Sequence, residues 1–376
     1  MKPFSWIELN LGILKQNIQK LQNLVGANTE IILVVKSNAY GHGLIPVSRC
    51  GWECGIRWFA VADLEEALRI REILPEAEIL VLGVIHPEDA SSAVKANVNV
   101  TIVSEHHAET LNQSLTNSTL PLRCHIKIDT GMGRLGLPYE YAIEIIRKIA
   151  KLRKLKIEGL FTHFAVSDEL QNEFTEIQAL RFRRIVEECK RGGLSTIMAH
   201  ASNSGGILRS RKWDFDAVRP GIVVYGYSPF GCRGSRESSG IEIPTQPFLF
   251  WKSCVLQTKR VPRGFMVGYG STYITPADTQ IVTIGVGYGD GYSRLLSNKG
   301  RVIIRDKFCP VVGRVNMNFI CADIGLDLEL SQWEEVTLIG GNESVSIWAD
   351  EIADLCDTIP YEVLTSIKTK YVNCLC

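Results

Sequence analysis

Runs of apolar residues alternate with amphipathic segments along the first two thirds of the chain. Residues 31–36 are apolar and mostly β-branched until the final lysine, a pattern typical of a strand covered on both faces. Residues 11–25 instead space their apolar side chains as an amphipathic helix does, and 64–73, 139–151 and 172–190 are also compatible with helices. In all, the pattern predicts eight strands, at 31–36, 58–62, 79–83, 98–103, 123–129, 156–163, 196–200 and 217–222.

This alternation favours a (β/α)₈ barrel, because eight strand–helix repeats within about 230 residues match the usual size of that fold. A doubly wound open sheet is the alternative. After a segment rich in Gly and Ser at 229–240, the pattern changes to strands and turns, at 249–260, 280–286, 300–305, 309–312, 319–324 and 335–339. We therefore predict an α/β chain with an N-terminal TIM-like barrel over 1–235 and a mainly β C-terminal domain over 236–376.

Composition narrows the possible partners and the compartment. The 376 residues exceed the usual size of one domain, and 41 basic residues balance 41 acidic ones. This balance gives no field that would attract nucleic acid or an anionic membrane, and no run of 18 apolar residues predicts a spanning helix. Eleven cysteines without a Cys-x-x-Cys pair suggest reduced thiols in the cytoplasm, with no metal site.

Five polar residues fall at or near the carboxyl ends of predicted strands: Lys36, Arg134, His163, His200 and Arg219. Taken singly, each has an ordinary explanation, such as a lysine reaching for water or a histidine bonded to the backbone. In a barrel, however, these strand ends converge on one face, where active sites are built. A lysine placed there can form an imine with an aldehyde cofactor.

A phosphate site is also indicated by the sequence. The loops after the seventh and eighth strands, 202–206 and 220–222, contain hydroxyls and glycines. Barrels commonly hold a phosphate there, because sterically open backbone N–H groups and hydroxyls suit a dianion. No Gly-x-Gly-x-x-Gly motif follows a strand, so a Rossmann dinucleotide site is not expected.

The segment 35–43, VKSNAYGHG, closely resembles the cofactor-lysine signature of the alanine racemases, which use pyridoxal 5′-phosphate (PLP). The resemblance implies that Lys36 carries PLP as a Schiff base and that Arg219 faces the ring nitrogen, where many PLP enzymes place a carboxylate. It places Arg134 beside the substrate carboxylate, oriented by Lys127, which is carbamylated in some members. The remaining implied contacts are His163 near the ring and Tyr40, Ser204, Gly221 and Ile222 at the phosphate.

Two segments of the second domain extend the resemblance. Tyr269, in VGYGSTY at 267–273, matches the second catalytic base of the family, and Tyr288, in GVGYGDGY at 285–292, matches a phosphate contact. Met317 matches a substrate-side residue. Racemisation needs proton exchange on both faces of the α-carbon, which one base cannot easily provide. The resemblance therefore implies that Lys36 and Tyr269 interconvert L- and D-alanine in a homodimer, with Tyr269 supplied by the partner.

Two departures from the family pattern leave the substrate open. Asn318 replaces a usual aspartate, and Thr369 stands where we expect a tyrosine that narrows the entrance to the site. A racemase with a shifted or broader substrate, such as serine or a basic amino acid, is therefore an alternative. A PLP-dependent decarboxylase of the same architecture is a further one, against which Arg219 argues because decarboxylation profits from a protonated ring nitrogen. A non-catalytic PLP carrier is the alternative outside the enzymes.

Overall fold

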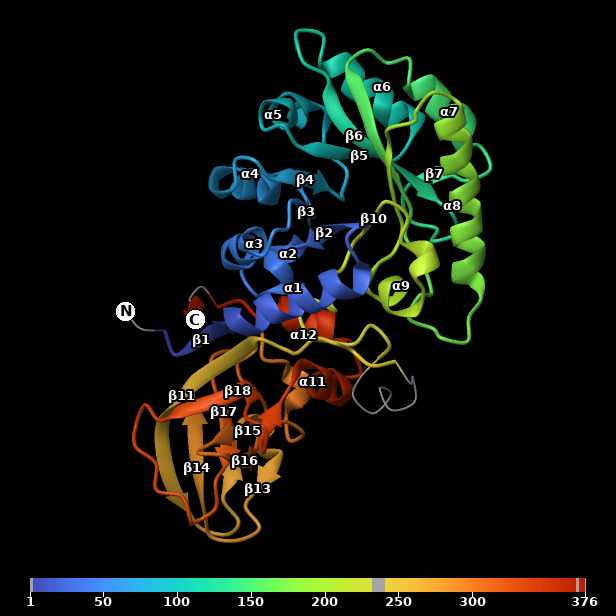
Figure 1. Cartoon of the computed structure of the whole chain (residues 1–376). Coiled ribbons are helices and arrows are strands. Elements are labelled where there is room, and N and C mark those ends of the chain that lie inside the picture. The colour runs from blue at the N-terminus through green and yellow to red at the C-terminus, as the bar shows by residue number, and fades with distance from the viewer. Residues whose placement is uncertain (1–2, 232–240, 370–371, 376) are drawn as a thin grey trace.

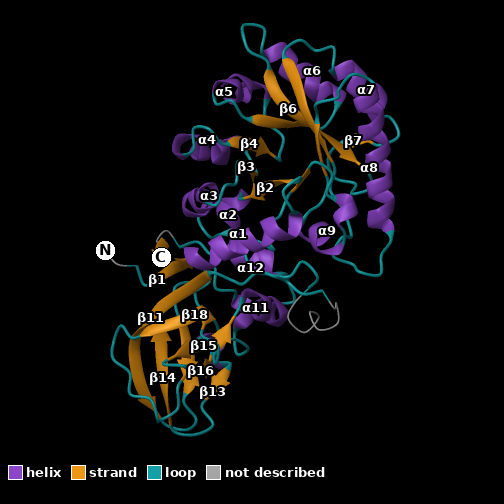
Figure 2. Ribbon diagram, viewed as in Figure 1, coloured by secondary structure: helices purple, strands orange, loops and turns teal. Residues whose placement is uncertain are grey.

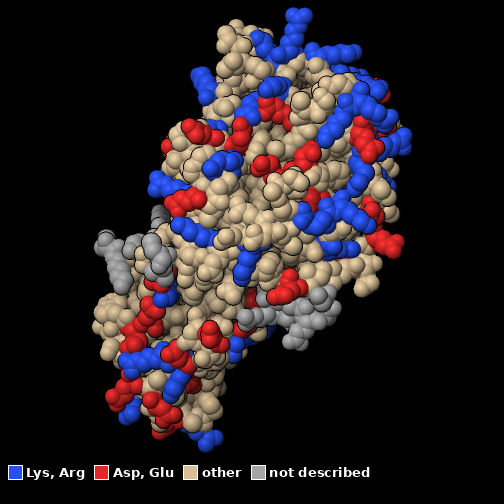
Figure 3. Space-filling model, in the orientation of Figure 1, with Lys and Arg blue, Asp and Glu red and all other residues tan. Residues whose placement is uncertain are grey.

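The computed structural model describes residues 3–231, 241–369 and 372–375. Figure 1 shows a barrel unit above a smaller sheet unit, with both ends of the chain close to the junction between them. Figure 3 shows acidic and basic side chains interspersed over the visible face, in keeping with the balanced charge of the chain. No helix within the described ranges has the length and apolar character needed to cross a membrane.

The upper unit is a closed barrel of eight parallel strands. Hydrogen bonding runs from β2 through β5 to β6, continues through β8, β9 and β10, and returns to β2. This closure confirms the predicted barrel and rules out the open sheet. The strands are β2 (Glu30–Val34), β3 (Trp58–Val61), β4 (Glu78–Val81), β5 (Asn99–Ile102), β6 (Leu122–Asp129), β8 (Leu155–Phe161), β9 (Met198–His200) and β10 (Ala217–Val218).

Helices cover the outside of the barrel, as Figure 2 shows. The first, α1 (Leu11–Val25), has the predicted bounds, and the side chain of Asn10 caps it by accepting a hydrogen bond from the backbone N–H of Ile13. Its apolar stripe, which includes Leu14 and Ile18, is buried. The others are α3 (Leu44–Glu53), α4 (Leu64–Ile73), α5 (Ala90–Lys95), α6 (Glu105–Ser114), α7 (Ala142–Ile149), α8 (Phe174–Arg191) and α9 (Ser204–Arg209).

The lower unit is built on a nine-stranded sheet, and all six strands predicted there are present. They are β11 (Leu249–Val261), β14 (Thr279–Ile284), β15 (Arg301–Ile304), β16 (Lys307–Pro310), β17 (Ile320–Asp323) and β18 (Glu335–Gly341). A short hairpin of β12 (Met266–Val267) and β13 (Tyr273–Ile274) stands apart from the sheet. Two helices, α11 (Ala349–Cys356) and α12 (Pro360–Ser366), lie towards the barrel.

The first strand of the chain belongs to this second sheet. β1 (Ser5–Asn10) pairs antiparallel with β11 and parallel with β20 (Val372–Leu375). The predicted barrel unit over 1–235 includes residues 5–10, because local periodicity does not reveal a pairing partner about 240 residues away. The predicted boundary between 235 and 236 lies outside the described residues.

Six of the eight barrel strands end earlier than predicted, and three of these carry predicted site residues at their ends. β2 stops at Val34, β8 at Phe161 and β10 at Val218, short of the predicted 36, 163 and 222. In the last case Pro220 and Gly221 follow, neither of which favours a central strand. Lys36, His163 and Arg219 therefore lie on the connections just beyond the strands. There the direction of a side chain is not fixed by the alternation of inward and outward positions along a strand.

Candidate active site

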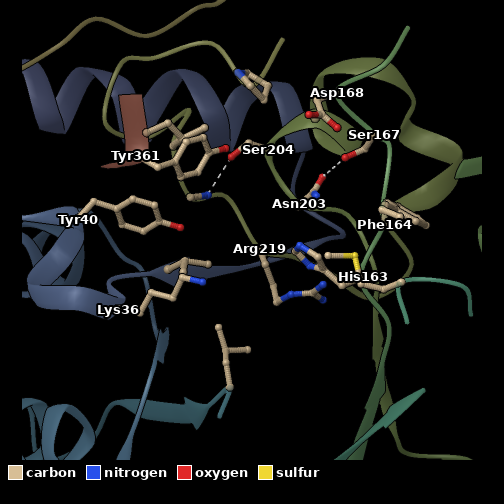
Figure 4. A pocket seen from close by; sticks show the side chains of 18 of the residues that line it. Lys36, Tyr40, His163, Phe164, Ser167, Asp168, Asn203, Ser204, Arg219 and Tyr361 are labelled. Atoms are coloured by element: carbon tan, nitrogen blue, oxygen red, sulfur yellow. Dashed lines mark hydrogen bonds between the residues drawn. The ribbon is translucent and has the colours of Figure 1, made fainter. Parts of the chain in front are cut away.

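A cavity of about 600 Å³ opens at the carboxyl ends of the barrel strands. Eight of the residues predicted from the sequence line it: Lys36, Tyr40, Arg134, His163, Ser204, Arg219, Gly221 and Ile222. Lys127 lines it as well. Figure 4 shows Lys36 and Tyr40 on one side of this cavity, and Arg219 and His163 on the other. The barrel thus gathers residues from five different strand ends, as the sequence pattern predicted.

An unusual backbone turn presents Lys36 to the cavity. Lys36 opens the short segment α2 (Lys36–Tyr40), and the four residues after it have φ between 52° and 54°, in the left-handed region. Non-glycine residues adopt this conformation only when the surroundings hold them in it. Here the buried carboxylate of Glu66 accepts hydrogen bonds from the backbone N–H groups of Asn38 (2.7 Å) and Ala62 (3.0 Å). The tertiary structure, with Glu66 on α4, therefore positions the lysine.

The cavity is rich in cations. Burial lowers the pKa of Lys36, and Arg134 and Arg219 lower it further, while Glu66 acts in the opposite direction. Burial and the same two arginines lower the pKa of Lys127 to about 8. Among the described residues that line the cavity, Asp168 is the one carboxylate. Such a site suits an anionic ligand, because negative charge that enters the cavity relieves the repulsion among these cations.

The upper end of the cavity in Figure 4 offers donors to a phosphate. The Ser204 hydroxyl oxygen accepts hydrogen bonds from the backbone N–H groups of Gly221 (3.0 Å) and Val223 (3.3 Å), so its own hydrogen is free to be donated. Burial raises the pKa of Tyr40, which keeps its hydroxyl protonated. A Cβ at Gly221 would lie 2.6 Å from the Tyr40 oxygen, so this approach requires glycine. These groups fit the phosphate of PLP.

Arg219 is buried beside the cavity and is tied to the barrel wall. One terminal nitrogen, Nη2, donates to the backbone carbonyls of Thr162 (2.6 Å) and Ala201 (2.9 Å). The other, Nη1, donates to Nδ1 of His200 (2.6 Å). Burial lowers the pKa of Arg219 to about 9. All three of these partners are neutral acceptors. The Arg219 guanidinium is therefore not bound to a carboxylate in these contacts, and it can act as a hydrogen-bond donor towards the cavity.

His163 lies on the same side of the cavity as Arg219, and the sequence predicts that both are near the ring of PLP. His163 follows β8 by two residues, and its backbone carbonyl accepts a hydrogen bond from Gln178 on α8 (3.1 Å). Burial lowers the pKa of its imidazole well below the ordinary range, and the cations at Arg219, Lys127 and Arg134 lower it further. The imidazole is therefore neutral in the folded protein and can stack on a planar ligand without adding another charge.

Three residues predicted for the same site lie elsewhere. Tyr269, Tyr288 and Met317 belong to the second domain, do not line the cavity, and are 73%, 41% and 57% exposed. Tyr269 sits at the tip between β12 and β13. Within one chain the cavity therefore contains the predicted lysine but not the predicted tyrosine.

The entrance residue was predicted at the wrong position. The hydroxyl of Thr369 donates to the backbone carbonyl of Ser5 (3.0 Å), away from the cavity, whereas Tyr361 lines the cavity and packs 5.9 Å from the ring of Tyr40. The segment YEV at 361–363 also resembles the family pattern, and this resemblance is the signal in the sequence that could have located the entrance residue. Sequence reasoning also missed Glu66 and Asp168, whose neighbours in the sequence give no sign of a site. No group of three or more metal-ligating side chains occurs in the described part of the chain.

Two family models cover nearly all of the chain: "Alanine racemase, N-terminal domain" matches 9–229, and "Alanine racemase, C-terminal domain" matches 248–374. An alanine racemase from Halothermothrix orenii is 37% identical over 97% of this chain and 95% of its own. A crystal structure of alanine racemase from Bacillus anthracis with bound L-Ala-P superposes with a TM-score of 0.92 at 31% identity, covering 100% and 96% of the two chains. One from Bartonella henselae with covalently bound pyridoxal phosphate superposes with a TM-score of 0.87 at 28% identity, over 100% of both chains.

Proposed function

The chain belongs to the alanine racemase family, and from this premise we propose how its own residues carry out the reaction. It is a PLP-dependent amino-acid racemase that interconverts L- and D-alanine. One observation carries the assignment of roles. Lys36, whose pKa is lowered, and Arg219, whose hydrogen-bond partners include no carboxylate, line the same cation-rich cavity. PLP, when bound, supplies an aldehyde that captures the amino nitrogen and a conjugated ring that withdraws electrons from the α-carbon.

Several residues of the barrel would hold the cofactor. Lys36 would bind its aldehyde carbon, and the hydroxyls of Tyr40 and Ser204 would donate to its phosphate. The backbone at Gly221 and Ile222 closes the same end. Support comes from the free hydrogen of Ser204 and the close packing of Gly221 against Tyr40. His163, neutral and buried, would lie against the ring.

Arg219 would face the ring nitrogen, and its chemistry favours racemisation over decarboxylation. A guanidinium can donate a hydrogen bond to that nitrogen but does not readily give up a proton to it. By donating without giving up its proton, Arg219 would leave that nitrogen neutral, and negative charge at the α-carbon would be stabilised less fully than with a protonated ring. Prompt return of a proton to the α-carbon is then favoured, as racemisation requires.

Proton transfer would use one base on each face of the α-carbon. Lys36, whose lowered pKa increases the fraction of free amine, would act on one face. Tyr269 would act on the other, and Tyr288 and Met317 would approach from the same side. Arg134 would hold the substrate carboxylate, and that charge relieves the repulsion among the cations of the cavity.

We further propose a homodimer in which the second domain of each copy completes the cavity of the other. The support is the separation within one chain between the cavity and the exposed residues Tyr269, Tyr288 and Met317. Large apolar side chains are exposed on the same domain, as an interface between copies would require: Phe265, Met266, Ile274, Leu295 and Phe319. We also propose a cytoplasmic location, supported by the nine free cysteines in the described ranges. Cell fractionation tests that location.

The activity is tested by kcat/KM for L-alanine, L-serine, L-lysine and L-arginine in the presence of PLP, with carbon dioxide release measured in parallel. We expect racemisation of alanine to exceed that of the other three and no carbon dioxide release. Because Thr369 lies away from the cavity, the case for a broader substrate rests on Asn318 alone. A preference for a basic amino acid, or decarboxylation, would overturn the proposal for alanine.

A further inference from the structure

A second histidine lies behind Arg219, and no step proposed above uses it. His125, on β6, is buried inside the barrel, and its Nδ1 lies 2.8 Å from Nε2 of His200. Nδ1 of His200 in turn lies 2.6 Å from Nη1 of Arg219. The three side chains form an unbroken line of hydrogen bonds from the cavity wall into the barrel interior.

The position of every proton on this line follows from Arg219. A guanidinium donates and never accepts, so Nδ1 of His200 must be the acceptor. Burial lowers the pKa of His200 well below its ordinary range, and that of His125 to about 3, so both rings are neutral. A neutral imidazole carries one proton, which on His200 must sit on Nε2. His125 must then accept that proton through its Nδ1 and carry its own proton on Nε2.

The barrel interior is shaped to hold His125 in this place. His125 pairs in register with Gly159 of β8, and a Cβ at Gly159 would lie 2.3 Å from Nδ1 of His125. The centroid of the Trp58 ring lies 5.7 Å from that of His125. Nε2 of His125 has no hydrogen-bond partner within the described protein, so it is the inner end of the line. A ring held so closely can accept from His200 in only one orientation.

We propose that His125 is a positioning residue for the racemase reaction: by accepting the Nε2 proton of His200, it keeps Nδ1 of His200 as a permanent acceptor for Arg219. With Nη2 held by two carbonyls and one Nη1 hydrogen held by His200, Arg219 keeps its Nε hydrogen and the second Nη1 hydrogen for the cavity. His125 thereby fixes the plane of the guanidinium that faces the ring nitrogen. This inference rests on the role proposed for Arg219.

The ordinary alternative is that His125 only fills space in the barrel core, and a pair of substitutions distinguishes the two. His125→Phe keeps an aromatic ring but removes the acceptor. His125→Asn loses ring volume but places an amide oxygen near the position of Nδ1. His107→Phe is the matched control, since His107 is also buried but bonds to the backbone of Ile85 on the outside of the barrel.

We expect His125→Phe to lower kcat by about tenfold, as losses of outer hydrogen-bond partners of functional groups commonly do, with little change in KM. The visible absorbance band of bound PLP should shift, because the donor at the ring nitrogen is no longer held. His125→Asn should restore kcat to within a few-fold and restore the band, and His107→Phe should change neither. If volume were what mattered, the order would be reversed, with Phe tolerated better than Asn, and the proposal would be wrong.

A measurement on the unmutated holoenzyme keeps the proposal testable even if a variant fails to fold. In protein labelled with ¹⁵N-histidine, His200 should show one neutral tautomer with the proton on Nε2, and this tautomer should persist in His125→Asn. A proton on Nδ1 of His200, or on both nitrogens, would overturn the proposal. An unmutated enzyme that does not racemise alanine would instead overturn the proposed function, so the two failures are distinguishable.

Discussion

The barrel rim and the exposed face of the second domain carry the two bases of the proposed mechanism but differ in how they are built. The rim encloses Lys36 among cations that shift its pKa, and hydrogen bonds fix the residues around it. The second domain presents Tyr269 on a hairpin tip, 73% exposed. One half is therefore organised by a single chain, whereas in the proposed homodimer the other half reaches a cavity only through a second copy. Five experiments test this contrast.

The largest effect is expected from Lys36→Ala. Removing the amine removes both the cofactor attachment and one base, so kcat/KM should fall by at least about 10⁴-fold in both directions. Borohydride reduction of the holoenzyme should also cease to label the peptide that contains residue 36. Lys20→Ala, on the exposed side of α1, is the control and should retain full activity. Label on another lysine would remove Lys36 from the proposal.

Tyr269→Phe should lower kcat/KM by about 10²–10⁴-fold through the loss of one proton-transfer group. Tyr141→Phe, at an exposed tyrosine on the barrel, should have no effect. The decisive step is to mix the two inactive variants, Lys36→Ala and Tyr269→Phe, and allow the subunits to exchange. Shared sites predict recovery of about a quarter of the native activity, since half of the dimers are mixed and each has one intact site. If each chain used its own tyrosine, no activity would return.

Acid should loosen the barrel before the second domain. All seven histidines lie within the first 200 residues, and the pKa values of five are lowered: His42 to about 4, His125 to about 3, and those of His107, His163 and His200. Between these folded values and the unfolded value near 6.5, the unfolded chain binds more protons. The free energy of unfolding therefore falls as pH drops below about 6.5, by up to about 1.4 kcal/mol per pH unit for each histidine.

Hydrogen exchange resolved by segment at pH 7 and pH 5 measures this difference. Strands β6, β8 and β9 should lose protection at pH 5 while β14 and β17 keep theirs, once intrinsic exchange rates are corrected for pH. Equal loss in both units would show that the domains unfold only together. Replacing His42 by Phe should reduce the acid sensitivity, because one fewer histidine then takes up a proton on unfolding.

A smaller effect concerns Lys127, whose pKa of about 8 leaves much of its amine neutral in mildly alkaline solution. The free amine can attack carbon dioxide and lose a proton, forming a carbamate that turns this cation into an anion near Arg134. With ¹³C-bicarbonate, we expect a carbamate carbon signal that grows as pH rises through about 8 and is absent in Lys127→Met. A signal that persists in Lys127→Met would assign the carbamate to another lysine.

The smallest effect separates the two positions considered for the entrance. Tyr361→Ala should enlarge the mouth of the cavity and raise kcat/KM for serine relative to alanine by several-fold, because a pocket discriminates weakly by size alone. Thr369→Tyr should leave that ratio unchanged, since the Thr369 side chain bonds to the backbone of Ser5 instead. A response at 369 without one at 361 would return the entrance to the position first predicted.

Much of the fold could be predicted because its signals are local. The bounds of α1 and α4, the eight barrel strands and the six strands of the second domain follow from runs and periods only a few residues long. The pairing of β1 with β11 could not be predicted, because nothing near residues 5–10 marks a partner some 240 residues away. The left-handed turn after Lys36 also could not be predicted, since Ser37, Ala39 and Tyr40 do not individually favour it and Glu66 holds it from another element.

The sequence by itself determined which chemical groups the site contains. A motif such as VKSNAYGHG specifies a lysine after a buried strand, and Arg134, His163 and Arg219 recur at later strand ends. Only the tertiary structure decided how those groups behave. Burial and mutual proximity set the pKa of Lys36, the line through His200 to His125 sets the orientation of Arg219, and exposure leaves Tyr269 outside its own cavity. These properties depend on distances between elements far apart in the chain, and local sequence patterns do not record them.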